Sequence, residues 1–192
     1  RGQHPRLAQH GLFATRRGNH RRASQHHVAP AAASQGQDHV GCAAVELLDE
    51  FLPYAQGCLR HPSERARLAV ILGQWTAQWK GKHRVFEYSR SHHGAFLHFN
   101  QLMAGKWVQA FTFVATRREG VCLRGPEPDR VRKAHKFRHN PLDSAPLDAL
   151  FEAWSLHPEA RPAGHAVEFF LEETPDDTWA ACLAEALTHL GA

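Results

Sequence analysis

A run of basic residues between positions 117 and 139 offers the clearest chemistry in this sequence. Only Glu119, Glu127 and Asp129 oppose its positive charge. Several cations within one Debye length attract phosphate groups, and arginine holds phosphate oxygens through paired hydrogen bonds. We therefore predict a non-enzymatic accessory protein that binds DNA, RNA or another polyanion through Arg117, Arg118, Arg124, Arg130, Arg132, Lys133, Lys136 and Arg138.

The charge is distributed unevenly along the chain, which leaves two alternatives to this function. Residues 41–142 carry sixteen basic and eight acidic residues, whereas residues 143–192 carry one arginine and ten acidic residues. One alternative is a hydrated basic loop that the acidic C-terminal third balances. The other is a protein–protein interaction module, in which an acidic face docks a basic partner or a second copy of the chain through Glu168, Glu172, Glu173, Asp176 and Asp177.

Polar residues on two predicted strands form the candidate for a catalytic site. Glu87 lies on the first strand and His98 and Asn100 on the second, with His83 nearby. A histidine held beside a carboxylate is a common acid–base arrangement, so a small hydrolase or nuclease is a further alternative function. The sequence contains no G-x-S-x-G motif, P-loop or G-x-G-x-x-G motif, and it leaves open whether the chain is an enzyme.

Sixteen histidines create several local pairs that are able to ligate a metal. His135 and His139 are four residues apart and would share one face of a helix, while His92 and His93 lie with His98 around one turn. Neither H-E-x-x-H nor a cysteine at diagnostic spacing accompanies them, so we expect no metal and no other cofactor. The four cysteines form no C-x-x-C pair, which favours reduced thiols in a cytoplasmic protein.

The elements that must position these residues are helical first and then extended. Apolar residues recur at helical spacing over 44–59, where Pro53 is expected to kink or divide the helix, and over 63–79. Period-two alternation and turn residues then predict strands at 82–90, 94–102, 106–118 and 120–125. A short helix within 125–142, a helix from Ser144, a strand at 166–171 and a helix at 175–190 complete the order, with Thr174 as the last helix's N-cap and Pro175 at its first position.

This order predicts an α+β fold in a single domain spanning 41–192. Short connections imply an antiparallel meander of three to five strands, packed against about four helices. Residues 107–116 are largely apolar on both strand faces, so this strand should be central and covered on both sides. All five tryptophans are expected in the core.

Residues 1–40 form a basic, low-complexity arm that differs from the rest. They carry six arginines, one acidic residue and few large apolar residues, so we expect the arm to be disordered or loosely packed. Three interpretations stay open: a nucleic-acid-binding arm, a targeting presequence, or a stretch outside the natural product, which would then begin near Val40. We expect no membrane partner, because no apolar run approaches the length of a span.

Overall fold

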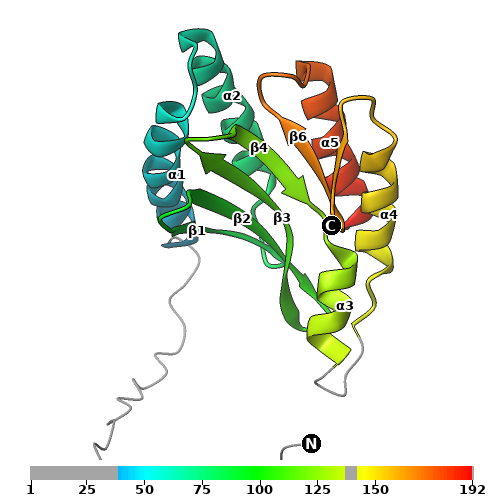
Figure 1. The fold of residues 1–192 in the computed structure, drawn as a ribbon. Helices are drawn as coiled ribbons and strands as arrows, with labels where there is room; N and C mark the ends of the chain where they lie inside the picture. The colour runs from blue at the N-terminus through cyan, green and yellow to red at the C-terminus, as the bar shows by residue number, and fades with distance from the viewer. Residues whose placement is uncertain (1–38, 137–141, 192) are drawn as a thin grey trace, which may run out of the picture. The chain divides into compact units, whose positions relative to one another are not determined.

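The computed structural model describes residues 39–136 and 142–191, with side chains described for 48–133 and 142–191. The arm at 1–40 therefore lies almost wholly outside the described residues, as do the side chains of His135, Lys136, Arg138 and His139. The described part contains five helices and six strands (Figure 1): α1 (His39–Gly57), α2 (Pro62–Gln78), β1 (Arg84–Arg90), β2 (Ala95–Met103), β3 (Lys106–Thr116), β4 (Gly120–Gly125), α3 (Pro128–Lys136), α4 (Ala145–Ser155), β5 (Arg161–Ala163), β6 (Ala166–Phe170) and α5 (Asp176–His189).

The strands form one sheet in the order β1-β2-β3-β4-β6-β5, and every neighbouring pair is antiparallel. The predicted α+β class and the meander are confirmed. The sheet has six strands, one more than the upper limit expected. The additional strand is β5, which was not predicted because it spans only three residues and includes Pro162. A strand this short shows no alternation that a sequence pattern could reveal. No helix in the described ranges is long and apolar enough to cross a membrane.

Aromatic residues of the helices and of one face of the sheet pack together and form the core. The Trp75 ring of α2 lies 5.2 Å from that of Phe111 and 5.3 Å from that of Phe113, both in edge contact. Trp154 of α4 and Trp179 of α5 contact the same indole at 6.3 and 6.4 Å. Helices α1, α2, α4 and α5 therefore share one side of the sheet, and each buries an apolar stripe there (Figure 1).

A β-bulge in β3 corrects the expected orientation of this strand. Phe99 of β2 pairs with Phe111, but Asn100 pairs with Gln109, so Ala110 is an extra residue. The bulge moves Trp107 and Gln109 to the face opposite Phe111. The prediction that all five tryptophans are buried is therefore wrong for Trp107, which is 49% exposed.

β3 is covered on both faces, as predicted, but only one of these covers is a layer of helices. Residues 110–115 are all buried, as predicted, but the second face is covered by side chains of neighbouring strands and by the start of α3. Ring contacts place α2, α4 and α5 on the first face, where Phe51 of α1 also contacts Tyr88.

The N-cap prediction for the last helix was also wrong. α5 begins at Asp176 with Pro175 as its N-cap and no side-chain cap bond. Thr174 lies one residue too early, and its hydroxyl is buried without a hydrogen-bond partner. Its carbonyl instead accepts hydrogen bonds from Arg67 and from the Trp179 indole, which tie the start of α5 to α2. α1 also runs through Pro53 without being divided.

Replacing Trp75 tests the central role of this aromatic cluster. Trp75→Ala should lower the free energy of unfolding by about 3–5 kcal/mol, because it removes a large side chain from a filled core. Trp107→Ala serves as the matched control and should cost much less, since that ring is half exposed. Urea denaturation followed by circular dichroism measures both, and similar losses for the two variants would contradict the assigned packing.

Candidate functional site

The second face of the sheet carries a polar hollow at its centre. The hollow has a volume of about 300 Å³ and is lined by residues of β1, β2, β3 and β4, of the segment leading into α3 and of α3 itself, namely Ser89, Phe96, His98, Gln109, Thr112, Val114, Arg124, Glu127 and Arg130. A neighbouring hollow of about 220 Å³ shares Gln109, Arg124, Glu127 and Arg130 with it and extends to Trp107. Polar groups thus converge where no helix of the first layer covers the strands.

His98 is the centre of a hydrogen-bonded chain in this hollow. Its Nε2 lies 2.8 Å from Oγ of Ser89, and its Nδ1 lies 3.0 Å from Oγ1 of Thr112. The Gln109 amide donates a 2.9 Å hydrogen bond to the same Thr112 oxygen. Gln109 faces Thr112 only because of the bulge at Ala110, so this irregularity of β3 completes the chain.

Burial lowers the pKa of His98 below its ordinary value of 6.5. The Glu87 carboxylate opposes this effect and Arg130 adds to it, but desolvation is the largest cause. The imidazole is therefore neutral at neutral pH and offers one nitrogen as an acceptor and one as a donor.

Some of the predicted catalytic residues meet and others do not. Glu87 lies directly opposite His98 in the β1–β2 register, but it does not line the hollow. Asn100 is buried and pairs with Val85, two pairs further along, and His83 precedes β1. Sequence reasoning missed both hydrogen-bond partners of His98, Ser89 and Thr112, which alternation along the strands could have found. It also missed Gln109, which bonds to Thr112 and which the bulge hides.

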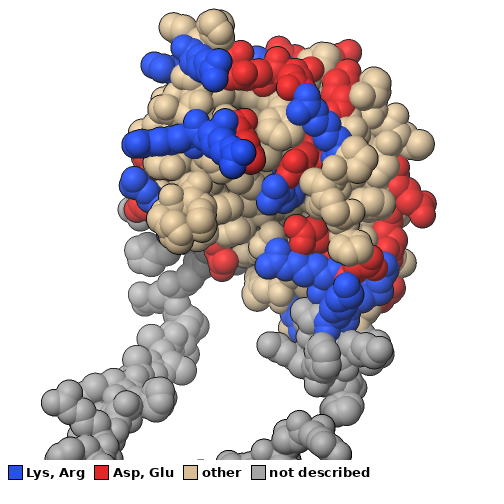
Figure 2. Space-filling view, viewed as in Figure 1, with Lys and Arg blue, Asp and Glu red and all other residues tan. Residues whose placement is uncertain are grey.

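Three of the six described cations of the predicted basic segment form ion pairs within the chain. Arg124 pairs with Glu168 of β6, and Arg130 with Glu127 at 3.2 Å. Arg132 pairs with Asp129 and, at 2.6 Å, with Asp148 of α4. Lys133 has no ion pair with any described residue. Figure 2 accordingly shows acidic and basic side chains interspersed over the visible surface.

Three of the five residues of the predicted acidic face also form ion pairs within the chain. Glu168 is buried against Arg124, and Glu173 pairs with Arg161. Asp176 pairs with Arg67 at the start of α5. Glu172 and Asp177 are exposed and form no ion pair within the described ranges. Only part of this acidic set is therefore left uncompensated at the surface.

Arg117 and Arg118 have a different environment, because the β1–β2 and β3–β4 turns lie at the same end of the sheet. They line a cleft of about 560 Å³, here called the arginine cleft, with Tyr54, Arg90, Ser91, His92, His93, Thr116 and Glu119. The Arg90 guanidinium lies 4.8 Å above the Tyr54 ring, and the His92 and His93 rings are 3.7 Å apart. Arg90, Arg117 and Arg118 form no ion pair with a described residue.

Comparisons with known proteins add no functional information. No known family model matches this chain, and neither a curated protein nor a solved structure matches it. The function is therefore inferred from the side chains that the fold brings together.

The lowered pKa of His98 predicts how stability depends on pH. Between the ordinary histidine pKa of 6.5 and the lower folded-state value, the unfolded chain binds more protons than the folded one. Stability is therefore lost as the pH falls through this window. His98→Gln should lose less stability than the parent chain between about pH 7.5 and about pH 5.5.

Urea midpoints at the two pH values measure this difference. His61→Gln is the control, because His61 is exposed and its side chain makes no cap hydrogen bond. An identical pH dependence for His98→Gln and His61→Gln would contradict the burial of a neutral imidazole.

Proposed function

We propose that this domain binds nucleic acid through the arginine cleft, with Arg90, Arg117 and Arg118 contacting phosphates. One observation carries the proposal: three arginines line one open cleft of about 560 Å³ in which Glu119 is the single carboxylate. Their charge is available to a ligand, whereas a phosphate at Arg124 or Arg132 would first have to displace a carboxylate.

Nucleic acid fits this cleft better than an acidic protein segment for two reasons. Clustered arginines recognise phosphate oxygens through paired hydrogen bonds and release condensed counterions on binding. The aromatic rings of Tyr54, His92 and His93 also line the cleft, and such rings provide stacking surfaces for bases. Phosphate contacts with little reading of base edges are the expected mechanism.

Salt dependence tests this function directly. In the triple variant Arg90→Gln, Arg117→Gln, Arg118→Gln, the negative slope of log affinity against log salt should become shallower by about 2–3, slightly less than one counterion per lost contact. Fluorescence anisotropy with labelled single-stranded and duplex oligonucleotides over a salt series measures the slope.

The control variant removes the same charge elsewhere. Arg60→Gln, Lys80→Gln, Lys82→Gln replaces three exposed cations that form no ion pair in the described part of the chain. In this control variant, the slope of log affinity against log salt should stay close to that of the parent chain. An equal loss in both variants would mean that net charge alone drives binding, and retained nucleic-acid binding in the cleft variant would contradict the proposal.

Hydrolysis at the sheet hollow is the second candidate function, favoured by the 2.8 Å contact between Ser89 Oγ and His98 Nε2. The Thr112 hydroxyl can accept hydrogen bonds from both Gln109 and His98 Nδ1, because it has two lone pairs. In that tautomer His98 Nε2 is free to take the serine proton as a general base. Ser89 would then act as the nucleophile.

An active-site-directed probe tests this second function. A fluorophosphonate should label Ser89 of the parent chain, and labelling should be absent in Ser89→Ala and about 100-fold slower in His98→Gln, which lacks the base. Ser91→Ala is the control, since Ser91 is exposed on the adjacent turn. Mass spectrometry locates the adduct, and a failure to label Ser89 would exclude the serine mechanism.

A further inference from the structure

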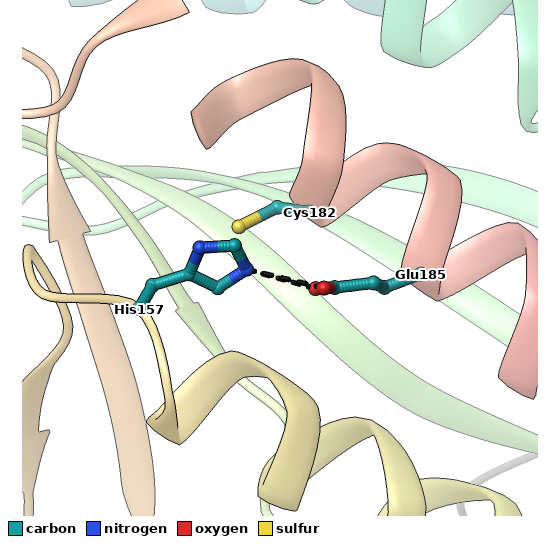
Figure 3. Close-up of side chains that lie close together, drawn as sticks. All are labelled: His157, Cys182 and Glu185. Carbon is teal, nitrogen blue, oxygen red and sulfur yellow. Dashed lines mark hydrogen bonds and ion pairs between the residues drawn. The ribbon is translucent and has the colours of Figure 1, made fainter. Parts of the chain in front are cut away.

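Three potential metal ligands meet between α4 and α5, away from both sites described above. His157 follows α4, while Cys182 and Glu185 lie one turn apart on α5 (Figure 3). One ligand atom from each lies within 4.8 Å of the other two. His157 Nε2 lies 3.0 Å from a carboxylate oxygen of Glu185. Within the described ranges, no other three such side chains come this close.

The burial of the three ligands changes across the group. Cys182 is fully buried, whereas the side chains of His157 and Glu185 are 18% and 30% exposed. Cys182 thus lies in the core, where the Trp154 indole donates a hydrogen bond to its backbone carbonyl. The partly exposed side chains of His157 and Glu185 give an ion a path of entry from solvent.

The surrounding charges favour a cation. Burial is the largest cause that raises the pKa of the Cys182 thiol, and the carboxylates of Glu185 and Glu159 raise it further. No described lysine or arginine contributes to this effect. Without a cation the thiol stays protonated, while a divalent ion would compensate the carboxylates and favour the thiolate.

We propose that His157, Cys182 and Glu185 bind one divalent metal ion of the zinc class, with water completing a tetrahedral site. Imidazole, thiolate and carboxylate are the ligand types that Zn²⁺ takes in proteins. Metal–ligand bonds of about 2.0–2.3 Å place tetrahedral donors roughly 3.5 Å apart. Spacings of up to 4.8 Å therefore have to close, whereas the 3.0 Å contact between His157 and Glu185 has to open slightly. Rotation of these two partly exposed side chains can supply both changes.

Binding would exchange one set of interactions for another. The metal ion replaces the proton of the Cys182 thiol, which passes to solvent, and it replaces the hydrogen bond between His157 and Glu185. The ion then joins the end of α4 to α5 and stabilises the folded chain. The ligands do not form a familiar motif, since His157 is remote from the Cys-x-x-Glu pair in sequence.

Cobalt spectroscopy of the full-length, chelator-treated and reduced chain tests the site. Co²⁺ bound to a thiolate gives a sulfur-to-metal charge-transfer band that the many histidines of the chain cannot produce. We expect this band to saturate at one equivalent, to disappear when Zn²⁺ is added, and to be absent from Cys182→Ser. Cys122→Ser is the matched control, since it removes another buried free thiol and should leave the band unchanged.

His157→Gln and Glu185→Gln keep the thiol and should each weaken Co²⁺ binding by at least about tenfold. Losing a residue that only contacts a metal ligand already costs about this much, and these changes remove the ligands themselves. Circular dichroism of each metal-free variant checks its fold, and these two partly exposed positions keep the test decisive if Cys182→Ser unfolds. Absence of the band from the parent chain, its persistence in Cys182→Ser, or unchanged affinity in both glutamine variants would overturn the proposal.

Discussion

The edge contacts of the Trp75 indole with Phe111 and Phe113 hold the molecule together, because the indole also contacts the tryptophans of α4 and α5. Every helix that takes part in this cluster must approach the sheet from the same side. Apolar burial, the main stabilising contribution, is therefore concentrated on one face. In the described part of the chain these helices leave the opposite face to neighbouring strands and to the start of α3, which must satisfy its polar groups. The hydrogen-bonded chain around His98 and the pair of Arg124 with Glu168 are the two results of that constraint.

The bulge at Ala110 connects this core to the polar hollow. On one side of it β3 supplies Phe111 to the aromatic cluster, and on the other it turns Gln109 towards Thr112. β4 passes the bulge at Gly125, whose φ is +129° and whose missing Cβ would lie 2.9 Å from the Cα of Phe111. A side chain at this position is excluded by both the backbone conformation and the close approach. The geometry of the hollow thus depends on one extra residue in β3 and one glycine in β4.

The sequence patterns predicted the parts of the fold that local periodicity determines. The helical stripes that carry Trp75 and Trp179 and the alternation along β1–β4 were sufficient for the α+β meander. Features that depend on a single residue or on distant contacts were not predictable: the bulge that exposes Trp107, and the start of α5 after Pro175 rather than at it. The same limit applies to the sites. Arg117 was identified from composition, but its proximity to Arg90 follows from two turns that the sheet brings to one end.

Charge segregation along the chain also does not become segregation in space. Arg124 and Arg132 of the basic segment reach Glu168 and Asp148 of the acidic third, so folding uses opposite charges to satisfy one another. A phosphate that approached such a pair would gain little binding free energy, because it would have to displace the carboxylate already in place. The displaced carboxylate would lose its partner and repel the phosphate, which is also negative. Cations that folding leaves without such partners keep their full attraction for a polyanion. Under the proposed function, the distribution of ion pairs therefore favours the turns that carry Arg90, Arg117 and Arg118 over Arg124 and Arg132 as the place where a polyanion would bind.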